Sequence, residues 1–138
     1  MRLIISFFFS FIIAARSKAQ ATYPQNNGES VRYDLIIEMS KAYLSGILIM
    51  LRDGDNTVNA SIVNEFGLSL MDFTYHEVKD KVTFHTLMGK LNKWYIKRIL
   101  KKDLRAILKL MQEGKEKTYF GSRNIKYSFE LQTTANQP

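Results

Sequence analysis

The chain has 138 residues, and its 20 lysines and arginines exceed its 13 aspartates and glutamates, which gives a formal net charge of +7 at pH 7. A chain of this length forms one domain with a core of ordinary size. It has no cysteine, which excludes disulfides, thiolate metal sites, a cysteine nucleophile and a lipidated N-terminal cysteine.

The first predicted element is a signal peptide over residues 1–19. Arg2 precedes an uncharged apolar run over residues 3–15, and small residues follow before a cut after Ala19 or Ala21. A helix that spans a bilayer needs about 20 apolar residues, so this run favours a cleaved signal over a permanent anchor. We therefore expect a periplasmic or secreted protein. Loss of the three cations of the signal leaves 17 cations against 13 acids, or +4.

A run of strands is predicted after a polar segment. Residues 20–30 contain Pro24 and Gly28 and show no apolar period, which predicts a flexible lead-in. From residue 31 to residue 38 apolar and polar residues alternate, as in a half-buried strand. Similar patterns predict further strands over residues 43–51, 58–66, 68–77 and 82–87. The Asp53-Gly54 pair between the first two of these is typical of a hairpin turn.

Residues 92–112 show the period of a helix instead. Apolar residues at intervals of three or four make one face, formed by Ile96, Leu100, Leu104, Ile107 and Met111. Asp103 would project into this apolar face in a continuous helix, whereas it suits the N-cap of a second helix over residues 104–112. The pattern therefore predicts two short helices, or one helix that bends near Lys102. Gly114 is expected to end the helix as its C-cap.

The last part of the chain completes the predicted fold. Residues 119–131 alternate again and predict a final strand, and residues 132–138 form a polar tail. The order of elements predicts a single α+β domain over residues 31–131. We expect a curved antiparallel β-sheet of about six strands, a half-barrel-like meander, with one or two amphipathic helices packed on one face.

No residue pattern in the sequence indicates catalysis. His76 and His85 fall on opposite arms of a predicted hairpin, but a third ligand at metal-binding spacing is missing. These histidines are expected to be polar-face strand residues. The sequence holds no phosphate-binding glycine loop and no nucleophile elbow. We therefore expect no enzyme, no metal and no cofactor, because an enzyme would need a cluster of these histidines with Asp72 or Glu77.

The charge of the predicted helix is the feature that most suggests a partner. Eight cations lie between Lys90 and Lys109 against Asp103 alone, a local charge of +7 that leaves the rest of the mature chain near −3. Such a field suits anionic lipid headgroups or an acidic protein, and the strands lack the exposed aromatic ladder of a nucleic-acid site. The candidate partner surface consists of Lys93, Trp94, Lys97, Lys101 and Arg105. The indole suits a membrane interface, while the alternative interpretation is a solvated helix face with no partner.

Two short stretches resemble a known family. Residues 44–50, Leu-Ser-Gly-Ile-Leu-Ile-Met, begin a strand with Ser-Gly, and residues 63–70, Val-Asn-Glu-Phe-Gly-Leu-Ser-Leu, contain an Asn-x-x-Gly-x-x-Leu strand link. Over about residues 31–112 the chain is similar to the bacterial periplasmic lipoprotein carrier and receptor superfamily, whose antiparallel half-barrel wraps helices on its concave side. The chain has fewer strands after the helices than that family and no lipidated cysteine, so it resembles only the soluble carrier type.

The resemblance implies an apolar cavity between sheet and helix that accepts acyl chains. The implied lipid-binding residues are Ile47, Ile49, Phe66, Leu70, Phe73, Phe84, Ile96, Leu100 and Ile107. The same residues could equally fill an ordinary core. The leading expectation is a non-enzymatic cell-envelope protein that binds a lipid or lipid-modified protein in this cavity. The alternative is an envelope interaction module that docks an acidic protein or a membrane surface through the basic helix face.

Overall fold

The computed structural model describes residues 21–114 and 117–132. The predicted signal peptide over residues 1–19 lies outside the described residues. Residues 133–138 of the predicted polar tail also lie outside them. The described part of the chain forms one antiparallel sheet and one α-helix, which confirms the α+β class.

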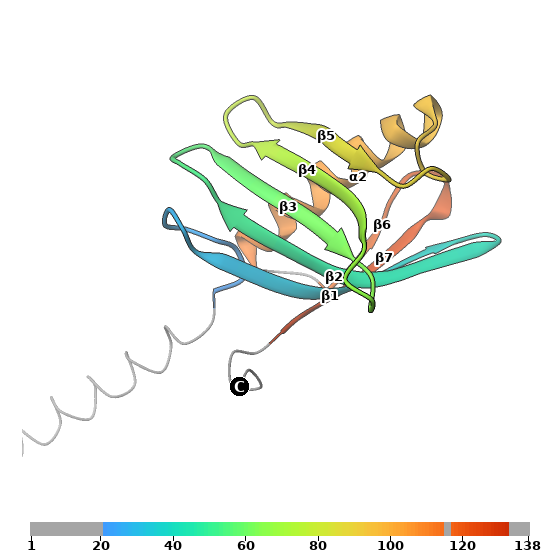
Figure 1. Cartoon of the computed structure of the whole chain (residues 1–138), viewed down its shortest axis with the longest axis horizontal. Coiled ribbons are helices and arrows are strands. Elements are labelled where there is room, and N and C mark those ends of the chain that lie inside the picture. Colours follow the sequence, from blue (N-terminus) through green and yellow to red (C-terminus); the bar gives the residue numbers. More distant parts are fainter. Residues whose placement is uncertain (1–20, 115–116, 133–138) are drawn as a thin grey trace, which may run out of the picture.

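The sheet has seven strands in the order β5-β4-β3-β2-β1-β7-β6. Their bounds are β1 (Ser30–Met39), β2 (Ala42–Arg52), β3 (Thr57–Val63), β4 (Ser69–His76), β5 (Lys81–Leu87), β6 (Thr118–Phe120) and β7 (Lys126–Leu131). The first five strands pair in chain order, and β7 returns to pair with the free side of β1. The sequence predicted one strand over residues 119–131, but a 3₁₀ turn, η1 (Ser122–Asn124), divides this segment into β6 and β7. In Figure 1 the β1–β2 hairpin extends beyond the other strands.

Alternation places one side of each strand in the core. In β1 the buried residues are Val31, Tyr33, Leu35 and Ile37, and the residues between them are exposed. The alternation continues across the pairing to β2, where Leu48 and Met50 lie opposite Tyr33 and Val31. Gly46 permits β2 to approach β3 closely, because a Cβ there would lie 2.5 Å from the carbonyl oxygen of Val63. The glycine of the Ser45-Gly46 pair within β2 therefore has a packing reason.

A single helix, α2 (Trp94–Glu113), forms where the sequence predicted two short helices or one helix bent near Lys102. Asp103 is not an N-cap, because it lies within the helix with a fully buried side chain. Its carboxylate accepts hydrogen bonds from the Tyr127 hydroxyl at 2.7 Å and from the backbone N–H and the hydroxyl of Ser122. These bonds satisfy the carboxylate and remove the reason for a break. Gly114 ends the helix in the left-handed conformation, φ 69°, which confirms the predicted C-cap.

The helix and the strands share one hydrophobic core. Its helix members are Leu100, Leu104, Ile107, Leu108 and Met111, and every strand from β1 to β5 and β7 contributes buried apolar side chains. Figure 1 shows α2 passing behind the sheet. Tyr127 of β7 reaches the buried Asp103, and a Cβ on Gly121 would overlap the Asp103 carboxylate. The β6–β7 region is therefore fastened to the middle of the helix.

Residues 21–29 pack into the fold, which differs from the predicted flexible lead-in. Tyr23 is only 1 % exposed, and its hydroxyl donates to Glu77 at 2.7 Å. The Thr22 hydroxyl donates to the carbonyl oxygen of Met111 in α2, and the Thr22 carbonyl accepts from the Tyr33 hydroxyl. These bonds join residues 11 to 89 positions apart, so the local residue pattern gives no indication of them.

Candidate functional site

The exposed side of α2 carries the surface that the sequence predicted. Lys93, Lys101 and Arg105 are exposed and Lys97 is half-buried. Trp94 is 75 % exposed and packs only edge-on against Tyr95, with ring centroids 5.7 Å apart. At about 100° per residue, Trp94, Lys97, Lys101 and Arg105 fall along one side of the helix. We call these four residues with Lys93 the basic face.

Most of the basic face has no ion-pair partner. Arg105 approaches Asp80 at 4.0 Å, and Lys109 beside the face binds the same carboxylate at 2.8 Å. Lys109 and the Tyr75 hydroxyl hold the pKa of Asp80 below its ordinary value. Lys93, Lys97 and Lys101 form no ion pair within residues 21–114 and 117–132. Because Asp103 is buried under the helix, it does not lie among these exposed cations.

The placement of these cations does not serve the helix itself. Positive side chains stabilise a helix near its C-terminus and weaken it near its N-terminus, where the macrodipole is positive. The first turn of α2 has no acidic residue, the last turn has no basic residue, and Lys93 at the N-cap makes no side-chain capping bond. The stability of the helix therefore does not explain the cations at its N-terminal end.

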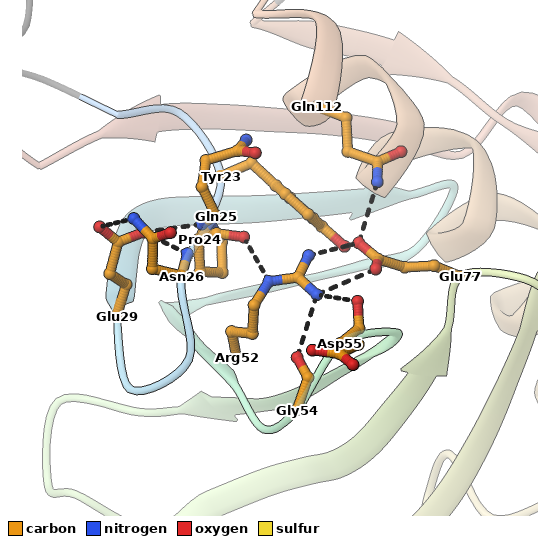
Figure 2. A network of polar contacts seen from close by, with 10 residues as sticks. All are labelled: Tyr23, Pro24, Gln25, Asn26, Glu29, Arg52, Gly54, Asp55, Glu77 and Gln112. Carbon is orange, nitrogen blue, oxygen red and sulfur yellow. Dashed lines mark hydrogen bonds and ion pairs between the residues drawn. The ribbon is translucent and has the colours of Figure 1, made fainter.

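A polar cluster at the other end of α2 is structural. Figure 2 shows Arg52 with its guanidinium directed at Glu77, and the two residues form paired contacts of 3.0 and 2.6 Å. Arg52 also donates to the carbonyl oxygen of Pro24, and Gln112 of α2 donates to Glu77. Arg52 holds the pKa of Glu77 below its ordinary value. Since every partner in the cluster belongs to the fold, the cluster fixes residues 21–29 and the C-terminal end of the helix.

Little in the residue pattern indicates this cluster. Arg52 ends an apolar strand and Glu77 begins a turn, and 25 residues separate them. An arginine at the end of an apolar strand indicates that this side chain needs a polar partner, but the pattern does not identify the partner. Burial raises the pKa of the Tyr23 hydroxyl well above its ordinary value, with the hydrogen bond to Glu77 adding to the effect.

The predicted lipid-binding residues divide into two groups. Phe73, Leu100 and Ile107 lie in the core, and Phe84 and Ile96 pack against it. Leu70 is also buried, at a bulge where β4 has one residue more than β3. These residues therefore lie on the core side of the sheet and of the helix.

The prediction was wrong for Ile47, Ile49 and Phe66. On β2 the core positions are Leu48 and Met50, so the two isoleucines point to the opposite side of the sheet. Phe66 lies in the turn before β4 and is 78 % exposed. Because side chains alternate along a strand, choosing the wrong parity moves a whole set of residues to the other face.

The space between helix and sheet is small. An apolar hollow of about 40 Å³ lies near the start of α2, lined by Ile37, Met39, Leu44, Leu91, Ile96, Ile99, Leu100 and Ile125. This volume admits a few water-sized groups and not an acyl chain. A larger ligand here would need the N-terminal end of α2 to move away from β1 and β2.

The residues of the conceivable catalytic cluster bind different partners. His85 contacts the Thr74 hydroxyl at 2.6 Å, Asp72 accepts a hydrogen bond from Ser61, and Glu77 belongs to the Arg52 cluster. The described ranges contain no group of three or more His, Asp or Glu side chains that could hold a metal ion. They also contain no helix long and apolar enough to cross a membrane.

Comparisons with protein-family models, with curated proteins and with solved structures found no match to this chain. The resemblance to the lipoprotein carriers therefore stays a prediction. What the protein does has to be inferred from its own residues and their geometry.

Proposed function

We propose that this protein is a non-enzymatic binding module of the cell envelope that docks on anionic lipid headgroups through the basic face of α2. The observation that carries the proposal is an exposed Trp94 aligned with Lys97 and Lys101, which have no ion-pair partner in the described part of the chain. Export through the predicted signal peptide would bring this surface to the outer side of a membrane.

The chemistry of the basic face fits an anionic surface. Each lysine or arginine near such a surface contributes about 1 kcal/mol, and the attraction falls off within a Debye length. An indole ring prefers the headgroup level, where its apolar body and its N–H are both satisfied. Lysine stems lie along apolar groups while their ammonium groups reach phosphates. Trp94 would therefore enter the headgroup layer while the flanking lysines bind phosphate oxygens.

The test uses the form of the protein that cells accumulate after expression of the full-length chain. The intact mass of this form reports whether residues 1–19 have been removed. It is then sedimented with vesicles of phosphatidylglycerol or of phosphatidylcholine. Binding to the anionic vesicles alone, weakened by added salt, is the expected result. Failure to bind phosphatidylglycerol would overturn lipid docking and leave an acidic protein as the partner of this face.

Charge reversal separates the basic face from general basicity. Lys97→Glu with Lys101→Glu removes two lysines from the headgroup layer, a loss of about 2 kcal/mol or roughly 30-fold in affinity, before repulsion from the new carboxylates is added. The matched control is Lys79→Glu with Lys81→Glu, which reverses two exposed lysines beside β5 and should retain most of the binding. Equal losses in the two double variants would contradict a localised site.

A lipid or lipid-modified protein bound between sheet and helix is the second candidate. The observation that favours it is the fully apolar lining of the hollow near the start of α2, which includes the predicted residues Ile96 and Leu100. Native mass spectrometry of the purified protein should then show a lipid adduct, and a fluorescent fatty acid should bind. A protein with no adduct and no affinity for the fatty acid contradicts this candidate and leaves the vesicle result unaffected.

A further inference from the structure

The side of β2 that faces away from the core is unusually apolar for a solvated sheet face. An antiparallel sheet with one buried face normally alternates apolar and polar residues along each strand. On β2, however, the run from Ile47 to Leu51 is apolar throughout, so Ile49 and Leu51 join Ile47 on the outward side. Leu51 is 43 % exposed, and Ile36 of β1 is 41 % exposed. A strand that is apolar on both sides is typical of a sheet covered on both faces.

This outward side is hollowed. A groove of about 590 Å³, which we call the outer groove, is lined by Asp34, Leu35, Ile36, Tyr43, Ser45, Gly46, Ile47, Asn64, Glu65 and Phe66. Tyr43 is 70 % exposed and Phe66 78 % exposed, so both aromatic rings are available to a partner. A smaller hollow of about 220 Å³ adjoins it through Asp34 and Ile36 and adds Glu130 and Lys117.

The charge of the outer groove selects a cationic occupant. Among its ten lining residues two are acidic, Asp34 and Glu65, and none is basic. Asp34 and Glu130 lie directly opposite each other in the β1–β7 register, and like charges at such positions repel. Lys117 lines the smaller hollow with both carboxylates, and the Gln132 amide donates to Asp34. A positive group from outside the chain would add to this compensation.

The basic face of α2 offers the complementary chemistry. Trp94 supplies an aromatic ring for the apolar wall of Tyr43 and Phe66, and such aromatic pairs add to simple burial. The aliphatic stems of Lys97 and Lys101 can cover outward apolar side chains while their ammonium groups reach carboxylates. Two copies that met through identical acidic grooves would instead bring like charges together.

We propose that the basic face of one copy docks into the outer groove of a second copy, head to tail. Each protomer then uses two different surfaces, so the contact repeats and the assembly grows with concentration. The same helix face serves lipid headgroups in the proposed function, so anionic vesicles should compete with the second copy.

The experiment uses sedimentation velocity over a concentration series of the purified protein and of two variants. The helix variant carries Lys97→Glu and Lys101→Glu, and the groove variant carries Glu65→Lys and Phe66→Ser. Lys101, Glu65 and Phe66 are exposed and Lys97 is half-buried, and thermal unfolding of each variant verifies that it folds. We expect the native protein to form multiples of the protomer mass that diminish at high salt, and each variant alone to stay monomeric.

Mixing the two variants is the decisive measurement. The helix variant keeps an intact groove and the groove variant keeps an intact basic face, so the mixture should form a species of twice the protomer mass and nothing larger. A native protein that is monomeric at every concentration overturns the proposal, and so does a helix variant that associates alone. The groove variant should keep full vesicle binding, so a failure of self-association and a failure of lipid docking are told apart.

Discussion

The two sides of α2 differ in what they contribute. The inward side carries Leu104 and Ile107, each 1 % exposed, with a fully buried Asp103 whose hydrogen bonds all lie within the fold. The outward side carries Trp94 and Lys101, whose side chains form no salt bridge with any described residue. The contacts of the inward residues lie within this chain, whereas the outward side chains are left accessible to solvent or to the partner proposed above.

The difference between the two sides predicts that one set of substitutions in α2 changes stability and another set changes binding. Substitutions on the inward side should change the free energy of unfolding, because they remove contacts that exist in the monomer. Substitutions on the outward side should change association with lipid or with a second copy and leave unfolding nearly unchanged.

Leu104→Ala should have the largest effect. The side chain is enclosed by the core, and truncation of a buried leucine removes apolar burial and leaves a cavity, at a cost of about 2–5 kcal/mol. Urea unfolding monitored by circular dichroism measures the loss. Leu68→Ala is the matched control, since Leu68 is 64 % exposed and should change stability by less than about 0.5 kcal/mol. Similar losses in the two variants would show that α2 does not pack as described.

Asp103→Ala should cost about 1–3 kcal/mol, because it leaves the Tyr127 hydroxyl and the Ser122 N–H without their acceptor. The same unfolding measurement applies. Asp103→Asn retains one carbonyl oxygen for the Tyr127 hydroxyl and should lose less than the alanine variant. A stable alanine variant would mean that the β6–β7 region does not depend on this carboxylate.

Glu77 should make the fold sensitive to acid. Its pKa in the folded protein lies below the ordinary value of 4.5, chiefly because Arg52 donates to the carboxylate. Such a group contributes stability above its unfolded pKa and loses that contribution as the pH falls through the folded pKa. The midpoint temperature of thermal unfolding should therefore decrease as the pH is lowered from 7 to about 3. Glu77→Gln should lower this temperature at pH 7 and make it depend less on pH. An unchanged pH profile in the variant would contradict the role of the ion pair.

Lys97→Glu with Lys101→Glu should have the smallest effect on stability, within about 0.5 kcal/mol of the native protein. Two carboxylates near the N-terminal half of a helix even suit its dipole. The same double variant should lose vesicle binding and self-association. Large destabilisation together with lost binding would remove the contrast between the two sides of α2.

Local spacing was enough to predict much of the fold. The two-residue period of β1 and the three-to-four-residue period of α2 identified these elements close to their observed bounds, and Gly114 marked the end of the helix. The exposed basic face also followed from the sequence, because the positions of lysines around a helix depend only on the angle per residue. The sequence therefore predicted well that these side chains share one side of the helix, while their role as a site stays a prediction.

The same spacing failed where a residue pattern was ambiguous or a partner was distant. The apolar run from Ile47 to Leu51 gives no indication of which residues face the core, because both parities are apolar, and only pairing with β1 and β3 decides it. That pairing placed Ile47, a predicted cavity residue, on the wall of the outer groove.

The sequence by itself determined the elements of this protein and the charge of its helix, because both depend on neighbours within a few residues. Only the tertiary structure decided that Asp103 continues α2, that Arg52 meets Glu77, and that residues 21–29 are fastened to the fold. Each of these depends on groups between 19 and 89 residues apart in the chain. Hydrogen bonds and burial act over a few ångströms in space, so these contacts form only when folding brings the distant residues together.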